Sequence, residues 1–508
     1  MNDPDFYENN LEAVKKRFPH LEKKIREAKE SSDYGPFQIS KTGICIPCLK
    51  NGNLLHSKYN PEREAKRFFS SNEGFILFCG LGSGIHIHYF LYNFKNNQCA
   101  ACESDFGALK ILLQKIDFTS IFLHPNFTLL PPLDDFYFEK DFIGTYLPIL
   151  HGSFKVKILR AWEDYYTNRL PSFQKKIESG LCKIKNDTAT QAAFGKIWMR
   201  NILLNLKTAS DIQPKAPKPD RTKTAYILGA GPSLENTIKI IKQNRNDFVL
   251  FASDTAFPVL TAHGIYADFF ISIDPQAVSY SHCFKPFSSS VTGIFDLCAN
   301  PLTVRTFLQN GNKILFTAGA HPFAQYAASF SPFPYCNTSS GTVAGAAKYS
   351  AFALGFKNIQ FAGLDFAYTD GKAYSKGTYL SKLFFKEAVK ISPIETKFCN
   401  VMFRTAVEKK NISGKITYTT ELLNGYKSVF RIIESVPKWK DTEFKKFPYS
   451  DFIFKIRSDA QKNAACLKTV FLPYLIYKTK IAYNVHNNKK EVPNLELILS
   501  EFERYIVE

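Results

Sequence analysis

The sequence predicts an α/β protein with a Rossmann-like N-terminal domain, a central doubly wound parallel sheet and a helical C-terminal region. Two observations carry this prediction. Glycine-rich turns at residues 80–84 and 229–233 each follow an apolar strand and precede a helical pattern. From Ala225 onward, short apolar segments alternate with helical segments, which is typical of a mostly parallel sheet with helices on both faces.

Residues 1–72 are predicted to form a helical lead, a hairpin and a further helix. The stretch "NNLEAVKKRFPHLEKKIREAKE" has helical patterning, and residues 36–56 alternate around an Asn-Gly-Asn turn. The further helix is expected to begin near Pro61, because proline suits the first helical position.

Residues 73–208 are predicted to form the Rossmann-like domain. The stretch "EGFILFCGLGSGIHIHYFLYNF" indicates a strand, a turn with three glycines and a helix. A second strand, "QCAACESD", ends at Glu103, as in dinucleotide- or methyl-donor-binding domains. An empty scaffold and a bound cofactor both stay open, because a fold does not imply a function.

Residues 209–224 are rich in proline and lysine, which indicates a linker. The central domain is expected over 225–385, with strands at "AYILGA", "FVLFAS", "DFFISID", "GIFDL", "KILFTAG" and "IQFAGLD". Beyond it the pattern becomes helical and mixed, so 386–508 is predicted to be a mostly helical domain.

The length of 508 residues suggests two to four domains. Lysine and arginine total 65 against 46 acidic residues, and the net charge of +19 favours anionic partners. The basic residues are dispersed, so no nucleic-acid partner is predicted. A polar N-terminus without a signal-peptide layout, and the lack of a long apolar run, predict a cytoplasmic protein with no membrane partner.

The 11 cysteines are scattered and odd in number, which predicts free thiols. Two pairs, Cys45/Cys48 and Cys99/Cys102, have the spacing of zinc ligands. The gap between the pairs is far longer than in common zinc ribbons. A strand would also point Cys99 and Cys102 to opposite faces, so no metal site is predicted and zinc is the minor alternative.

The turn Gly229–Ser233 has the chemistry of a phosphate cradle. Gly229 and Gly231 let a ligand approach the backbone, and Pro232 suits the first helical position. Ser233 adds a hydroxyl in the first turn, where free N–H groups and the helix dipole favour an anion. The alternative is a tight turn without a ligand.

Polar residues follow several strands of the central domain, where ligands of open parallel sheets bind. Asp254 and Asp274 come after the second and third strands, and a possible second anion site opens a later helix. The remaining candidates at this edge are Ser340, Gly341, Thr342, Asp365, Tyr368 and Tyr374.

Taken in order, "GAGPSL", "SDT", "IDP" and "GTVAGAAKYSAFALGFKNIQFAGLDFAYTDGK" resemble the motility accessory factor family. That family shares an MptE-like central domain with archaeal hydroxymethylpterin diphosphokinases. The same segments are similar to bacterial sialyltransferases that use a CMP-activated sugar, which carry G-N-G-P-S and S-G-x-Y…G-I-D-F motifs. The resemblance covers Ala225 to about Gly377 and extends weakly upstream through Leu54–Phe69, so a sialyltransferase-like central sheet is expected.

The resemblance assigns roles to single residues. Asp254 falls where the sialyltransferases place a nucleotide-binding asparagine, and Tyr368 and Tyr374 match two tyrosines that steady the phosphate, if one residue is inserted here. The expected phosphate-side residues are Gly229, Gly231, Pro232, Ser233, Ser340 and Gly341, joined by Thr342 and Asp365 as nucleotide-binding candidates.

The sialyltransferases also place a catalytic histidine about thirty residues after the G-I-D-F strand. In this chain no histidine lies between His321 and His486. His321 and Asp274 are therefore the two candidates for the general base.

By resemblance, the protein is a glycosyltransferase that moves a nonulosonic, sialic-acid-like sugar from a CMP donor to Ser or Thr of flagellin, in support of flagellar assembly and motility. No cofactor or metal is expected, because amide groups, helix dipoles and tyrosine hydroxyls can stabilise the departing CMP. The flanking regions are expected to hold flagellin or to form an oligomer. The substitution Gly231→Val is expected to abolish nucleotide binding and leave the fold intact.

Two alternatives stay open. A pterin diphosphokinase would bind ATP, with Asp254, Asp274 and Asp365 holding Mg²⁺. A non-catalytic flagellin-binding chaperone would keep only a vestige of the site.

Overall fold

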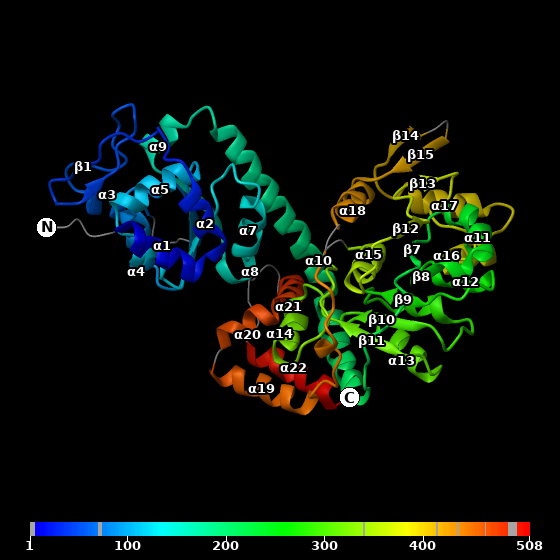
Figure 1. Cartoon of the computed structure of the whole chain (residues 1–508). Helices are drawn as coiled ribbons and strands as arrows, with labels where there is room; N and C mark the ends of the chain where they lie inside the picture. The colour runs from blue at the N-terminus through cyan, green and yellow to red at the C-terminus, as the bar shows by residue number, and fades with distance from the viewer. Residues whose placement is uncertain are drawn as a thin grey trace. The chain divides into compact units, whose positions relative to one another are not determined.

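A computed structural model describes residues 6–69, 74–338, 341–412, 415–433, 436–462, 464–485 and 495–507. The chain forms two compact units, Met1–Thr190 and Gln191–Glu508 (Figure 1). Helix α10 (Leu170–Asp211) crosses the boundary between them and ends inside the predicted linker. Within the described ranges, no helix combines the length and apolar character needed to cross a bilayer.

The first unit is built on a parallel sheet with the strand order β5-β4-β3-β6. The strand bounds are β3 (Phe75–Cys79), β4 (Cys99–Cys102), β5 (Phe127–Leu129) and β6 (Phe154–Ile158). Helices α4 (Ile85–Asn93) and α5 (Phe106–Lys115) follow β3 and β4. The predicted Rossmann-like succession of strand, glycine turn, helix and strand is therefore confirmed.

The elements before this sheet match the predicted lead. They are α1 (Phe6–Arg17), α2 (Pro19–Glu27), β1 (Gln38–Ile39), β2 (Cys45–Ile46) and α3 (Pro61–Arg67). Strands β1 and β2 pair antiparallel, and a further bridge joins Cys48 to Leu54 around the Asn-Gly-Asn turn. Helix α3 begins at Pro61 because the Asn60 side chain accepts a hydrogen bond from Arg63 N and caps the helix.

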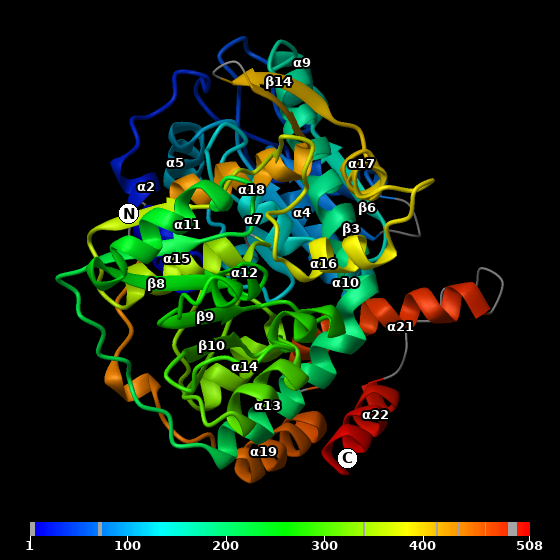
Figure 2. The same cartoon turned by 90° about the vertical axis from the view of Figure 1, so that its right-hand side faces the viewer.

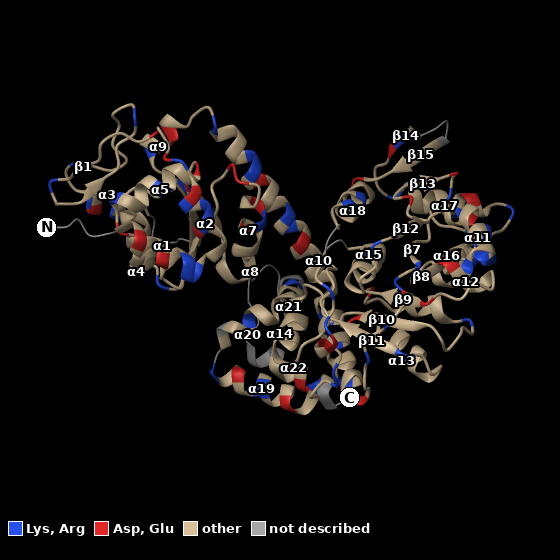
Figure 3. Ribbon diagram, viewed as in Figure 1, with Lys and Arg blue, Asp and Glu red and all other residues tan. Residues whose placement is uncertain are grey.

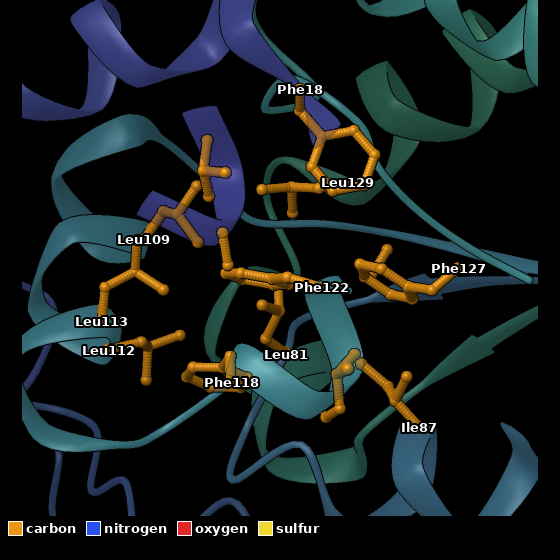
Figure 4. Packing of buried hydrophobic residues seen from close by; sticks show 14 of the residues in the cluster. Phe18, Leu81, Ile87, Leu109, Leu112, Leu113, Phe118, Phe122, Phe127 and Leu129 are labelled. Atoms are coloured by element: carbon orange, nitrogen blue, oxygen red, sulfur yellow. The ribbon is translucent and has the colours of Figure 1, made fainter. Parts of the chain in front are cut away.

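Strands β3 and β4 of the first sheet are buried on both faces. On one face, Leu109, Leu112 and Leu113 of α5 pack with Phe18, Leu81, Ile87, Phe118, Phe122, Phe127 and Leu129 (Figure 4). The short helices α6 (Thr119–Phe122), α7 (Phe138–Thr145), α8 (Pro148–His151) and α9 (Arg160–Tyr165) complete the unit.

The two thiols of β4 lie in different cores. Cys99 belongs to the cluster on the α5 side, and Cys102 belongs to the cluster around Trp162. The predicted opposite orientation is confirmed, so this pair cannot bind one metal ion together.

The second unit contains a six-stranded, fully parallel sheet with the order β11-β10-β9-β8-β7-β12. Its strands are β7 (Thr224–Leu228), β8 (Phe248–Ser253), β9 (Phe269–Ser272), β10 (Thr292–Asp296), β11 (Ile314–Thr317) and β12 (Ile359–Ala362). All six coincide with the predicted strands, and Figure 2 shows β8, β9 and β10 side by side. The chain runs outward from β7 to β11 and then returns to place β12 on the other side of β7. The switch point of the sheet therefore lies between β7 and β12.

Helices cover both faces of this sheet, which confirms the doubly wound arrangement. Helix α15 (Val343–Ala353) packs on β7, β8 and β9. On the other face, Phe270 of β9 packs between Phe257 of α12 (Phe257–Ala262) and Phe307 of α13 (Pro301–Gln309), with ring-centroid distances of 5.0 and 4.6 Å. Helix α11 (Leu234–Gln243) connects β7 to β8.

The C-terminal region is mainly helical, as predicted, but two of its strands pair with a strand of the predicted central domain in a sheet that was not predicted. Strands β13 (Tyr368–Thr369), β14 (Glu408–Ile412) and β15 (Lys415–Thr419) pair antiparallel in the order β13-β15-β14. The sequence of β14, Glu-Lys-Lys-Asn-Ile, lacks an apolar alternation, so periodicity gave no signal for it.

The remaining helices are α14 (Pro322–Phe330), α16 (Tyr379–Glu387), α17 (Ile394–Met402), α18 (Glu421–Ile432), α19 (Tyr449–Lys462), α20 (Ala464–Val470), α21 (Leu472–Val485) and α22 (Leu495–Val507). Phe323 of α14 contacts Phe452, Phe471 and Phe502, so α14 packs with the last helices. Figure 3 shows lysine and arginine scattered over the described elements rather than gathered on one.

Candidate functional site

The turn Gly229–Ser233 joins β7 to α11 and is pinned to the end of β12. Gly229 N donates a hydrogen bond to Ala362 O (2.9 Å), and Gly231 N donates to Gly363 O (2.8 Å). The turn therefore lies at the switch point of the sheet, where open α/β sheets bind their ligands.

The Asp365 carboxylate occupies the anion position of this turn. Its Oδ2 accepts a hydrogen bond from Ser233 Oγ at 2.8 Å, and both of its oxygens lie 3.3 Å from Ser233 N. Burial raises the pKa of Asp365, and hydrogen bonds from Ser233 and Thr369 oppose that shift. The turn thus holds an anion, as a helix N-terminus favours, but the anion belongs to the chain itself.

Gly231 is required by this close approach. A Cβ at this position would overlap Asp365 Oδ2 and would lie 2.8 Å from Gly363 O. The backbone oxygen cannot move without shifting the end of β12. Gly231→Val is therefore expected to destabilise the turn in addition to blocking the nucleotide.

The loop after β13 docks onto the same turn. Ser375 N donates to Ala230 O at 2.8 Å, Lys372 Nζ lies 2.9 Å from Glu235 Oε2, and Lys376 N donates to Glu235 Oε1 at 2.7 Å. Ser375 is fully buried, and its Oγ has no hydrogen-bond partner. An unpaired hydroxyl beside the turn is the kind of group that a ligand satisfies.

Asp254 and Asp274 follow β8 and β9 at the same edge of the sheet. Asp254 is buried; its Oδ1 accepts from Thr255 N (2.7 Å), and its Oδ2 accepts from Ser272 Oγ (2.9 Å). Asp274 is half-buried, and its Oδ1 accepts from Gln276 N at 2.9 Å. Burial and the nearby Asp254 charge raise the pKa of Asp274.

The tyrosines predicted at this edge belong to one electrostatic group. The Tyr374 side chain is 37% exposed, yet protein atoms around its hydroxyl raise its pKa. Tyr368, Asp254 and Tyr426 add to that increase, and the positive charge of Arg404 opposes it. Arg404 is therefore a cation within electrostatic reach of the predicted phosphate-steadying tyrosine.

The second predicted anion turn precedes α15. Ser340 lies outside the described residues. Gly341 has a φ of +66°. Its backbone lies close to the Tyr426 ring, since a Cβ added at Gly341 would be only 3.2 Å from Tyr426 Cε1. The Thr342 side chain accepts from Gly345 N at 3.0 Å and caps α15.

His321 lies away from this group. Its Nδ1 accepts from Phe323 N at 3.2 Å, so it caps α14, and its ring packs edge to face on Trp198 at 5.4 Å. Burial lowers the pKa of His321 to about 3, which makes it a poor base. His321 follows β11, which is four strands away from β7 in the sheet. At ~4.8 Å between neighbouring strands, β11 and β7 are about 19 Å apart. Of the two candidates, the geometry favours Asp274.

Three residues of this edge were missed from the sequence: His282, Arg404 and Tyr426. His282 lies in η2 (Ala277–Cys283), in the loop after β9 that also carries Asp274, so an inspection of that loop would have found it. Arg404 and Tyr426 come from beyond the sheet and have no local sequence signal.

A separate cleft of about 1210 Å³ lies at the opposite, amino-terminal edge of this sheet. Residues 212–220 cover it, and Arg245, Asp268, Lys313 and Phe444 contribute to its lining. None of the predicted site residues lines this cleft.

The glycine turn of the first unit is filled by protein. A Cβ on Gly80 would lie 2.8 Å from Trp162 Cδ1. Glu103 Oε1 accepts from Leu81 N (2.6 Å), and its Oε2 accepts from Ser104 N (3.1 Å) and Trp162 Nε1 (3.3 Å). In a cofactor-binding domain, the residue at the position of Glu103 would bind the ribose, but here both of its carboxyl oxygens already accept hydrogen bonds from the protein. These residues do not fit a dinucleotide or a methyl donor.

A comparison with protein families finds a match over the central domain. Residues 197–371 match the family described as 6-hydroxymethylpterin diphosphokinase MptE-like. Two uncharacterized proteins of Treponema pallidum (strain Nichols) are similar to the chain. One is 44% identical over 229 residues, which are 44% of this chain and 79% of the relative. The other is 39% identical over 178 residues, which are 35% of this chain and 85% of the relative.

A solved structure, that of the MAf glycosyltransferase from Magnetospirillum magneticum AMB-1, is similar over 89% of this chain and 78% of that one. The TM-score is 0.48 and the sequence identity is 14%.

Fold and site together define an α/β protein with an MptE-like central domain, as the sequence predicted. The chain belongs to the same family as the two Treponema pallidum proteins.

Proposed function

We propose that the protein is a glycosyltransferase that binds a CMP-activated nonulosonic sugar at the switch point of the second unit and transfers the sugar to Ser or Thr of flagellin. One observation carries the proposal. The turn Gly229–Ser233, the end of β12 and the tyrosine-bearing loop are joined by hydrogen bonds at one edge of the sheet. These are the segments whose sequence resembles motility accessory factors and CMP-dependent sialyltransferases.

The residues at this edge suit the departure of a CMP phosphate. The charge that develops on the phosphate oxygen needs hydrogen-bond donors and a cation close by. The Tyr374 hydroxyl and the Arg404 guanidinium interact electrostatically with each other and can supply both. Ser233 can donate to the phosphate only when Asp365 gives up its hydrogen bonds, so ligand and carboxylate compete for the same donors.

The hydrogen bonds of the carboxylates support a transfer that needs no metal. Asp254, Asp274 and Asp365 each accept hydrogen bonds from amide or hydroxyl donors of the chain. These hydrogen bonds hold the carboxylates in place without a metal ion, and the metal-free transfer is proposed on the resemblance to CMP-dependent sialyltransferases. No cofactor is therefore proposed.

A pterin diphosphokinase is the second candidate, because the matched family carries that description. It would use ATP and Mg²⁺, with the same three carboxylates as metal ligands. A flagellin-binding chaperone is the non-catalytic alternative, which predicts flagellin binding without turnover.

The acceptor is proposed to bind to the parts of the chain outside residues 225–385. A nucleotide and one sugar fill a single crevice at the strand ends. The regions before and after the central domain are therefore available to hold a polypeptide or to form an oligomer. We place the reaction in the cytoplasm, where newly made flagellin and CMP-sugars occur together.

The test is a transfer assay with the full chain, recombinant flagellin and a CMP-nonulosonate, read as the mass increase of flagellin. Tyr374→Phe should lower kcat about 10-fold or more, because it removes a donor to the departing phosphate. Tyr266→Phe is the matched control, since Tyr266 is exposed and precedes β9 at the opposite edge of the sheet. Equal rates for the two variants, or turnover only with ATP, Mg²⁺ and a pterin, would contradict the proposal.

A further inference from the structure

His282 is a buried histidine with an unsatisfied nitrogen. It lies in η2, is 7% exposed, and its Nδ1 has no hydrogen-bond partner. Its ring packs edge to face on Tyr379, the first residue of α16, at 5.5 Å. Buried polar atoms are nearly always paired, so an orphaned imidazole nitrogen at the ligand edge of a sheet calls for an explanation.

Two carboxylates that follow neighbouring strands interact electrostatically with this imidazole. Asp254 follows β8 and Asp274 follows β9, and both of their charges favour the protonated imidazole. Burial has the larger effect and lowers the pKa of His282. The side chain is therefore neutral at rest, and two negative charges are in place to stabilise the imidazolium that forms when it takes up a proton.

These features are those of a general base. A base must be neutral before the reaction, must have a free lone pair and must be stabilised once it is charged. His321 fails the second condition, because its Nδ1 lone pair accepts from Phe323 N, and its unpaired Nε2 then carries the proton of the neutral ring. His282 meets all three.

We propose that His282 accepts the proton of the acceptor hydroxyl during sugar transfer, with Asp274 and Asp254 as its charge partners. This assignment rests on the proposed function. The hydroxyl oxygen forms a bond to the anomeric carbon of the sugar, and the bond from that carbon to the phosphate oxygen breaks. The electron pair of the broken bond stays on the CMP phosphate. The hydroxyl proton moves to His282 Nδ1 and is later released to water.

The assignment divides the crevice into two halves. The departing phosphate lies over β7 and β12, near Ser233 and Tyr374. The acceptor hydroxyl lies over β8 and β9, near His282. Strand β8 lies between β7 and β9. At ~4.8 Å between neighbouring strands, β7 and β9 are about 10 Å apart, a distance that one sugar can bridge. The Tyr379 ring packs against His282, so an acceptor that reaches His282 has to displace the start of α16.

The test compares His282→Gln with His263→Gln in the transfer assay and in CMP calorimetry. Glutamine keeps the size and polarity of the side chain but cannot take up the proton, so kcat should fall ~100-fold or more. The affinity for CMP should stay the same, because the phosphate half is untouched. His263 is exposed after α12 and serves as the matched control.

The pH profile gives a second readout. The titratable groups near His282 are Asp254 after β8 and Asp274 after β9, which act on its pKa, its sequence neighbour Cys283, and Tyr379 of α16, which contacts its ring. In the wild type, kcat should fall on the acid side as His282 becomes protonated, at a pH below the ordinary histidine value of 6.5. His282→Gln should lose this acid limb.

Rescue keeps the test decisive if His282→Gln folds poorly. Free imidazole should restore part of the transfer rate of His282→Gly. A His282→Gln chain with wild-type kcat and an unchanged acid limb would overturn the assignment alone. A wild-type chain that neither binds CMP nor transfers the sugar would overturn the proposed function and the assignment with it.

Discussion

The Glu103→Gln variant should abolish a pH dependence of stability in the first unit. Glu103 is fully buried at the end of β4, and burial raises its pKa from the ordinary 4.5 to about 7, against three hydrogen bonds from Leu81, Ser104 and Trp162. The folded chain therefore keeps a proton that the unfolded chain has already lost between these two pH values. The unfolded state binds fewer protons in this window, so the stability falls as the pH rises.

The magnitude follows from the two pKa values. Each pKa unit corresponds to about 1.4 kcal/mol. The increase from 4.5 to about 7 therefore contributes about 3 kcal/mol to the free energy of unfolding while Glu103 is protonated. This stabilisation is fully present below pH 4.5 and is lost by about pH 7. Glutamine carries no titrating proton, so the variant should lack this slope.

The assay is urea unfolding from pH 4.5 to 8, followed by tryptophan fluorescence. Trp198→Phe and Trp439→Phe in both proteins leave Trp162 beside Glu103 as the reporter. The difference between the two proteins isolates Glu103, because every other titrating group is common to both. A difference that does not change with pH would refute the argument. A difference of opposite sign would mean that the three donors outweigh burial.

Four further results are expected. Gly231→Ala should destabilise the second unit by about 1–3 kcal/mol through overlap with Asp365; an unchanged thermal midpoint would contradict the packing at the turn. Asp365→Asn should raise CMP affinity in calorimetry, because it removes an anion from the phosphate position, and weaker binding would show that the carboxylate assists the ligand. Trp162→Ala should cost about 3–5 kcal/mol and be partly rescued by added indole; no response to indole would argue against a filled cofactor position. Transfer should survive EDTA, and a loss restored by Mg²⁺ would favour the diphosphokinase.

Local patterns predicted all six strands of the central sheet and strands β3 and β4 of the first sheet, but not β5, β6 or the antiparallel sheet of β13, β14 and β15. The strand at Ala225 and the turn after it combine an apolar run with glycines, and these signals depend on neighbouring residues only. The same holds for the helix at Pro61, because the Asn60 cap lies next to it in the sequence.

The contacts that define the site are long-range, and the sequence could not predict them. Ser233 and Asp365 are 132 residues apart, so nothing local shows that the carboxylate fills the glycine turn. Trp162 and Glu103 are 59 residues apart, and their contact decides that the first turn holds no cofactor. Both turns had the sequence of a ligand site, and in each case an acidic side chain of the chain itself binds the turn amides.

The most direct test of the nucleotide site is calorimetry of the full chain with CMP in the absence of metal and with ATP in the presence of Mg²⁺. The account predicts that CMP binds without metal and that Ser233→Ala, which removes a hydroxyl from the turn, weakens this binding. It also predicts that ATP with Mg²⁺ does not compete with CMP. Tight binding of ATP with Mg²⁺ and no binding of CMP would contradict the account.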